Sequence, residues 1–442
     1  MKRKKIGLGL AAICFSMCVS GCAGKTVEPS VESVIVESSS DKLSEIQTSA
    51  EMISMEPSEV AMSVTIEEPL QDETESVQEA ESQEVSLVMV GDILMHTKVY
   101  ESGLMEDGSY DYDHMFAQVR EDIEAADIAL VNQEVILGGR ELGLSGYPAF
   151  NAAYEVGDSL VNAGFDVILH ATNHALDKGK KGLLNCIHFW EECYPDIAVL
   201  GIHESQEDAQ EIYVQEVNGI RLAILNYTYG TNGISLPKDM PYAVELWDEK
   251  QITEDVTRAK EMADFVIVCP HWGTEYVLEE TADQRKKAQF LADLGVDLVI
   301  GTHPHVVEPV KWVTGTAGNE TLVYYSIGNF INATSGTGTG KAARMLGAMA
   351  EVTITMDDET QKAYISQYGI EPLVTHNVSG SGQITTYKLE DYTEELAAEN
   401  EMIYQDSAFS IAYCESICSE VFGDLYMERE EGTGEDDYSN GE

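Results

Sequence analysis

The sequence contains few basic residues for its length. Its 442 residues include 26 lysines and arginines against 78 aspartates and glutamates, which gives a formal net charge of −52 at pH 7. Acidic residues outnumber basic ones in the N-terminal, central and C-terminal parts alike. A phosphate backbone is repelled by such a chain, so the composition argues against nucleic acid as a partner. Metal cations, in contrast, are attracted by the same charge.

Cysteines are also few, and no two of them have C-x-x-C spacing. Three of the eight lie in the first 22 residues, and the other five are Cys186, Cys193, Cys269, Cys414 and Cys418. This odd-numbered set predicts neither a disulfide framework nor a zinc–thiolate site. We expect these five side chains to be buried apolar residues, although one late pair could still be bridged.

The apolar run near the N-terminus is short of the about 20 residues that a membrane-spanning helix needs. Four basic residues at positions 2–5 precede it, which is the layout of a secretory signal. The run closes with V-S-G-C, which resembles the lipobox of bacterial lipoproteins. The resemblance implies that Cys22 is lipidated, is the first residue after cleavage and holds the protein at the extracellular face of the bacterial cell membrane. A chance run of small residues before a cysteine is the alternative.

The composition divides the rest of the chain into three parts. Residues 23–84 are rich in Glu, Ser, Val and Thr and poor in aromatic residues, which predicts an acidic, disordered tether. Residues 85–385 carry the apolar runs of a folded domain, and residues 386–442 form an acidic, helix-prone C-terminal tail. No internal repeat is visible.

Within the folded part, apolar runs alternate with amphipathic stretches. The expected strands are 85–90, 128–131, 167–169, 198–200, 222–225, 265–268, 298–300 and 322–325, with two more after Met345. Expected helices include 113–126, 153–163, 181–192, 254–263 and 281–294. This alternation predicts an α/β architecture on a largely parallel or mixed sheet.

Polar residues recur just past the ends of these apolar runs. They are Asp92, Asn132 and Glu134, Asn173 and His174, His271 and Glu275, and His303 and His305. In open α/β sheets the ligand site lies outside the carboxyl ends of the strands, so five strands would deliver metal-competent groups to one edge. Each residue alone could instead cap a helix or form hydrogen bonds within the core.

The motif V-I-G-T-H-P-H places two histidines on either side of Pro304. In a strand, residues i and i+2 project to the same face, so His303 and His305 could point together into one site. Imidazole, carboxylate and amide donors without thiolate suit Zn, Mn or Fe. The number of candidate ligands exceeds what one tetrahedral ion needs, which suggests two metals.

A series of motifs resembles the CapA family of poly-γ-glutamate capsule biosynthesis proteins, of the calcineurin-like metallophosphatase superfamily. The motifs are V-G-D-I, N-Q-E, A-T-N-H-A-L-D-K-G, H-W-G-T-E-Y, G-T-H-P-H-V-V-E-P and Y-S-I-G-N-F-I, between residues 85 and 335. The resemblance implies a four-layer α/β/β/α sandwich with mixed sheets and one or two divalent metal ions. It implies Asp92, Glu134, Asn173, His271, His303 and His305 as metal ligands and His174 as the catalytic acid.

The sequence departs from the superfamily pattern at two places. The first motif is G-D-I-L-M-H rather than D-x-H, which leaves His96 an uncertain ligand, and N-x-E stands in place of G-D-x-x-D. Trp272, Glu275 and Asn329 are candidate substrate-binding residues, with burial of the aromatic ring and a structural turn at Asn329 as the duller alternatives. Asp177 could merely shape the start of the next helix.

Two functional hypotheses follow. In the first, the protein is a surface-anchored metal hydrolase that cleaves a phosphoester or an amide in a capsule or cell-envelope polymer. In the second, it is a non-enzymatic factor for assembly or retention of an anionic polymer such as poly-γ-glutamate. Capsule synthesis and export proteins would be its partners in either case.

Overall fold

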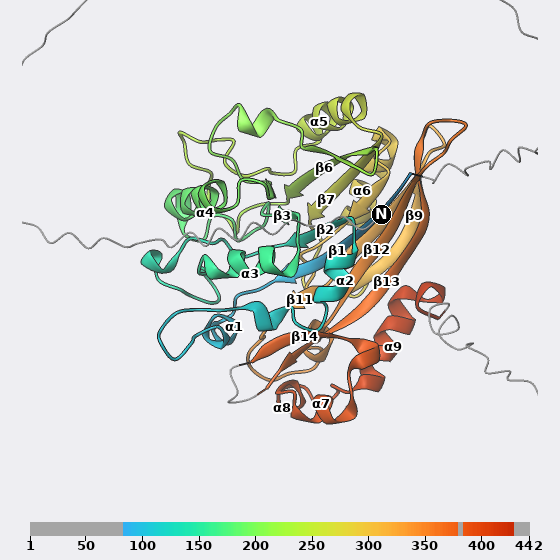
Figure 1. Cartoon of the computed structure of the whole chain (residues 1–442). Helices are drawn as coiled ribbons and strands as arrows, with labels where there is room; N and C mark the ends of the chain where they lie inside the picture. Colours follow the sequence, from blue (N-terminus) through green and yellow to red (C-terminus); the bar gives the residue numbers. More distant parts are fainter. Residues whose placement is uncertain (1–82, 379–382, 428–442) are drawn as a thin grey trace, which may run out of the picture. The chain divides into compact units, whose positions relative to one another are not determined.

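The computed structural model describes residues 83–378 and 383–427 (Figure 1). These ranges leave out the signal peptide predicted at 1–22, residues 23–82 of the predicted tether, and residues 379–382 and 428–442. Within them, no helix is both long enough and apolar enough to cross a membrane.

Two mixed sheets form the centre of the fold. The first has the order β14 (Ile384–Lys388), β13 (Ala363–Asn377), β12 (Leu346–Met356), β1 (Glu84–Ile93), β2 (Ile128–Asn132), β3 (Val167–Leu169) and β4 (Ala198–Leu200), with β11 (Asn329–Ile331) paired to β1. The second has the order β5 (Val214–Val217), β6 (Ile220–Thr228), β7 (Phe265–His271), β8 (Leu298–Ile300), β10 (Glu320–Ile327) and β9 (Val307–Thr314). Strands β1 to β4 run parallel to one another, as do β6, β7, β8 and β10.

Alternation along β2 explains how the layers pack. Ile128 and Leu130 join the core between the two sheets, whereas Ala129 and Val131 join a second core beneath helices. Since successive side chains of a strand point to opposite faces, a strand that is apolar at every position must be covered on both sides.

Helices cover the outer face of each sheet (Figure 1). On the first sheet these are α1 (Thr97–Ser102), α2 (Arg120–Ala125), α3 (Glu155–Ala163) and α4 (Gly179–Cys193). On the second they are α5 (Glu249–Met262) and α6 (Ala282–Leu294). The α/β/β/α sandwich with mixed sheets expected from the sequence is therefore confirmed.

The expected strands agree with the structure, but one expected helix does not. The stretch 113–126 is interrupted: a single 3-10 turn, Asp113–Met115, is separated from α2. The chain turns here so that the Phe116 ring stacks on Phe330 and meets Phe165 edge-on. Tertiary packing of an aromatic side chain overrides local helix propensity.

The C-terminal segment continues the fold. The boundary predicted after residue 385 falls inside β14, and α7 (Glu394–Glu399), α8 (Met402–Gln405) and α9 (Ile411–Phe422) follow. Ile417 and Phe422 of α9 are buried and belong to the same apolar cluster as the residues between the sheets. Cys414, on the same helix, is a buried free thiol, so it forms no bridge with Cys418. Cys186 and Cys269 are also buried free thiols, whereas the Cys193 side chain is exposed.

Candidate metal centre

The polar residues near the strand ends meet in one place, where the carboxyl ends of parallel strands from both sheets come together. Asp92 is the second-last residue of β1, Glu134 follows β2, and Asn173 follows β3 in the first sheet. His271 ends β7, and His303 and His305 follow β8 in the second sheet. Each sheet therefore supplies three of the six predicted ligands, and all six side chains are buried.

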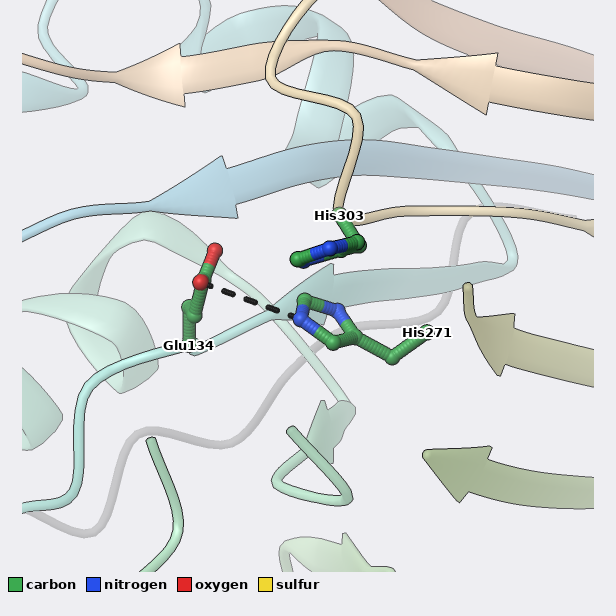
Figure 2. A group of neighbouring side chains, drawn as sticks. All are labelled: Glu134, His271 and His303. Carbon is green, nitrogen blue, oxygen red and sulfur yellow. Dashed lines mark ion pairs between the residues drawn. The ribbon is translucent and has the colours of Figure 1, made fainter. Parts of the chain in front are cut away.

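Glu134, His271 and His303 form the centre of this cluster (Figure 2). The carboxylate of Glu134 points at the imidazole of His271, with 3.7 Å between Oε1 and Nε2, and the ring of His303 lies beside that of His271 at 4.8 Å between centroids. On its other side, His271 has Nδ1 2.9 Å from the Thr302 hydroxyl. This bond fixes the ring so that Nε2 faces the cluster.

Asp92 and His305 form a second group that shares Glu134. The Nδ1 atom of His305 lies 3.0 Å from Asp92 Oδ2, and its Nε2 lies 3.7 Å from Glu134 Oε1. Asn132 donates a 2.8 Å hydrogen bond to the other oxygen of Asp92. The side-chain oxygen of Asn329 lies 3.1 Å from His305 Nδ1, and the side-chain nitrogen of Asn329 donates to the His305 carbonyl. Asn329 thus positions His305, and two carboxylates converge on one small volume.

The two histidines around Pro304 reach the site by a different route from the one predicted. They lie in a loop after β8, not in a strand, and both have a positive φ, 98° for His303 and 58° for His305. The His303 amide donates a 3.2 Å hydrogen bond to Asp92 Oδ2. Left-handed backbone at non-glycine residues is strained and persists where its surroundings enforce it, often at functional sites.

The loop after β3 brings Asn173 and His174 to the same cluster. Asn173 Oδ1 lies 2.9 Å from His271 Nε2. His174 Nδ1 lies 2.6 Å from Asp177 Oδ2, while its Nε2 faces Glu134 at 3.9 Å from Oε1. The His174 ring meets the Phe150 ring edge-on at 4.7 Å. Asp177 also accepts from the Phe150 amide, so a carboxylate and an aromatic ring together orient the imidazole.

Burial controls the protonation of these groups. Burial, with the Asp92 carboxylate acting in the same direction, raises the pKa of Glu134 well above its usual value. Burial and then the neighbouring His303 lower the pKa of His271. Burial alone would lower the pKa of His305, but Glu134 and Asp92 raise it to about 9. His305 in turn lowers the pKa of Glu134, but burial has the larger effect on that pKa. The two carboxylate oxygens of Glu134 form no hydrogen bond.

The donor set fits a divalent cation. Both carboxylate oxygens of Glu134, and Nδ1 of His303, are buried and have no hydrogen-bond partner. A buried carboxylate that accepts no hydrogen bond costs several kcal/mol of folding free energy, so such a group needs a cation or a proton. Imidazole nitrogens beside carboxylate and amide oxygens match Zn, Mn or Fe. These side chains could hold one or two ions.

The remaining predicted residues lie at different distances from this centre. Glu275 is exposed at the rim, where its carboxylate comes within 4.8 Å of donor atoms of His303 and His305. Trp272 does not join them: it is fully buried between the second sheet and its helices, and its indole donates to the Tyr325 carbonyl. It is a packing residue rather than a substrate contact. Cys22 lies outside the described residues.

His96 stands next to the cluster rather than in it. Its ring packs edge-on against Phe150, 5.3 Å between centroids. Burial and then the charges of His305 and His174 lower its pKa to about 4. The groups of metal-competent atoms in the described residues do not include it.

Three neighbours of the centre were not predicted from the sequence. Tyr229 places its ring 4.7 Å from that of His303, Asn232 lies 3.4 Å from His174 Nδ1, and Asp177 orients His174. Tyr229 and Asn232 follow β6, whose carboxyl end adds no histidine or carboxylate to the site. The signal that could have found them is position alone, because β6 is parallel to and beside β7.

A comparison with known protein families shows to which family the chain belongs. Residues 86–334 match the family described as "Bacterial capsule synthesis protein PGA_cap", which is more than half of the chain. The chain belongs to the PGA_cap family. The matched residues include every predicted ligand, and they end just after Asn329.

Two relatives are moderately similar to this chain. The chain is 30% identical over 269 residues to "Capsule biosynthesis protein CapA" of Bacillus anthracis, covering 58% of this chain and 61% of that protein. It is 33% identical over 174 residues to "PGA biosynthesis protein CapA" of Bacillus subtilis, covering 39% and 44%. The chain thus spans about three fifths or less of these relatives.

Among solved structures, the calcineurin-like phosphoesterase YfkN from Bacillus subtilis matches with a TM-score of 0.37 and 12% identity, over 76% of this chain and 99% of that one.

Proposed function

We propose that this PGA_cap protein acts in the synthesis of a capsule or cell-envelope polymer, such as poly-γ-glutamate, through a metal-dependent hydrolase-like site. One observation carries the proposal: the Glu134 carboxylate is buried without a hydrogen-bond partner among His271, His303 and His305. A purely structural cluster would satisfy that carboxylate with donors, as Asn132 does for Asp92.

The ligands would be Asp92, Glu134, Asn173, His271, His303 and His305, with Mn, Zn or Fe as the ion. A bound ion of this kind acidifies water and polarises a phosphoryl or carbonyl oxygen. The chain's own contribution is orientation and proton transfer. Asp177 holds the His174 ring through Nδ1, which leaves Nε2 directed at the cluster to give a proton to a leaving group.

We expect the purified protein, loaded with Mn, to hydrolyse either bis-p-nitrophenyl phosphate or a γ-glutamyl amide. His174→Gln should lower kcat by about 10² or more, because a positioned general acid contributes that much. Asp177→Asn should lower kcat less, since it disturbs only the orientation of the ring. Steady-state kinetics on both substrates, with metal content measured on the same samples, gives the result.

The alternative function is non-enzymatic assembly or retention of an anionic polymer. It is supported by the names of the relatives, which refer to capsule biosynthesis rather than to hydrolysis. A protein that takes up Mn, keeps it in both variants, and hydrolyses neither substrate would exclude the enzyme and favour the assembly factor. Capsule synthesis and export proteins would then be its working partners.

We also propose that the protein is anchored at the extracellular face of the membrane through lipidated Cys22. The support is the basic, apolar leader that closes with V-S-G-C. Cys22→Ala should move the protein from the membrane fraction to the soluble fraction or stop its processing. Fractionation and the mass of the mature N-terminus measure this, with Cys18→Ala as the control. Normal processing and full membrane retention of Cys22→Ala would disprove the anchor.

A further inference from the structure

A guanidinium group lies at the edge of the metal centre without a carboxylate partner. The Cζ atom of Arg344 stands 3.4 Å above the Tyr276 ring. Its Nε is buried and has no hydrogen-bond partner, and one terminal nitrogen donates to the Thr334 hydroxyl at 3.3 Å. Within residues 83–378 and 383–427, no acidic side chain forms an ion pair with it. In a chain with net charge −52, an arginine without a carboxylate in ion-pair contact calls for a reason.

The Tyr276 ring connects Arg344 to the ligands. It lies 6.0 Å from the His305 ring, and the Tyr276 amide donates to the Pro304 carbonyl at 2.7 Å. Tyr276 has φ 67° and is 44% exposed, so a strained backbone presents a half-exposed aromatic face beside the histidines. Arg344 therefore stands at the mouth of the centre and not on a remote surface.

The short turn that carries Arg344 is held firmly. The Arg344 carbonyl accepts hydrogen bonds from Asn329 at 2.9 Å and from Asn332 at 3.1 Å. At the start of the turn, buried Asp406 accepts from the backbone amides of Lys341 and Ala342. Asn329 is the residue that also positions His305, so one side chain sets both the ligand and the arginine. Such preorganisation reduces the entropy lost when a ligand is bound.

We propose that Arg344, stacked on Tyr276, anchors an oxyanion of the substrate, a carboxylate or a phosphoryl group, beside the metal centre. Guanidinium presents parallel donors that match such groups, and stacking on an aromatic ring occupies its face rather than its edge. The inference rests on the proposed function and makes it more specific. The substrate is an anionic chain with a charged group next to the reacting bond.

The structural alternative is that Arg344 only packs on Tyr276. The test is binding, not turnover, of two probes by isothermal titration: a γ-linked glutamate oligomer, which offers carboxylates, and a short phosphodiester-linked oligomer. Each is titrated into the full-length protein in EDTA and again after loading with Mn. Arg344→Gln should weaken binding of the favoured probe about tenfold or more in both conditions, and Arg344→Lys should recover part of the loss.

Arg221→Gln is the matched control. It makes the same change of charge, but Arg221 lies at the amino end of β6, where it pairs with Asp264, away from the metal centre. The affinity of the Arg221→Gln variant for both probes should equal that of the wild type. The probe whose binding depends on Arg344 identifies the oxyanion as carboxylate or phosphoryl.

The two proposals fail in different ways. Wild-type protein that takes up no Mn defeats the metal-dependent function, while the comparison in EDTA still decides the role of Arg344. Arg344→Gln or Arg344→Lys that binds both probes as tightly as wild type, with unchanged metal content, overturns the anchor and leaves the metal centre standing. If Arg344→Gln does not fold, the conservative lysine variant supplies the decision.

Discussion

Replacing Glu134 by Gln should abolish metal uptake and yet leave the metal-free protein at least as stable as the wild type. Glutamine has the shape of glutamate without the charge, and the two Glu134 oxygens form no hydrogen bond that could be lost. Burial already raises the pKa of Glu134 well above normal, so the metal-free site favours a neutral side chain at this position, and glutamine is neutral. Most ligand substitutions destabilise a core, so this combination of effects is diagnostic.

The measurement is a thermal melt with and without Mn or Zn, beside elemental analysis. A ligand at 100 times its Kd adds about 2.7 kcal/mol to the free energy of unfolding, so wild-type Tm should rise by several degrees with metal. Glu134→Gln should show no such rise. A variant that melts lower without metal and still gains stability from it would contradict the assignment of Glu134 as a ligand.

Glu308→Gln is a close control for Glu134→Gln. Glu308 is fully buried, has one oxygen without a hydrogen-bond partner, and burial raises its pKa to about 8. Its neighbour is Gln284 rather than a histidine. Its substitution should therefore change stability in the metal-free state without affecting metal content.

The second large effect should come from Gly91→Ala, which we expect to prevent folding. A Cβ atom on Gly91 would stand 2.0 Å from the carbonyl oxygen of Gly328, a backbone atom that cannot rotate away. Here β11 pairs with β1, with Asp92 opposite Asn329. Separating these strands would cost more than the about 1–3 kcal/mol of ordinary overpacking.

Soluble yield and circular dichroism measure the effect of Gly91→Ala. Gly369→Ala is the control, because Gly369 lies in β13 of the same sheet and its added Cβ would meet only the Glu351 carboxylate at 3.5 Å. That variant should fold and melt as the wild type does. A folded Gly91→Ala protein with unchanged Tm would show that β11 does not approach β1 as closely as described.

Alternation of apolar residues predicted most of the framework from the sequence. Strands β3, β4 and β8 have the predicted bounds, because each is a short apolar run between turns. The helix expected at 254–263 starts earlier in the structure, since the Asp248 side chain accepts from two backbone amides and caps α5 at Glu249. Local signals of this kind are present in the sequence and can be read there.

The chemistry of the centre was only partly accessible to sequence reasoning. Residue types and strand ends indicated His271, His303 and His305, but the i, i+2 argument assumed a strand where the chain forms a loop with positive φ. Arg344 lies 39 residues beyond His305 and reaches the site through a turn that Asn329 and Asp406 hold. Contacts between such distant segments depend on the whole fold, and no local pattern encodes them.

The division of the ligands between the two sheets has a consequence for how the protein comes apart. Asp92, Glu134 and Asn173 belong to one sheet, and His271, His303 and His305 to the other, while the surfaces between the sheets are joined by apolar contacts. An ion held by both sets would act as a cross-link between two halves that otherwise could separate. Loss of the ion and separation of the sheets would then be one event, so that proteolytic lifetime, and not only catalysis, would follow the metal supply of the surroundings.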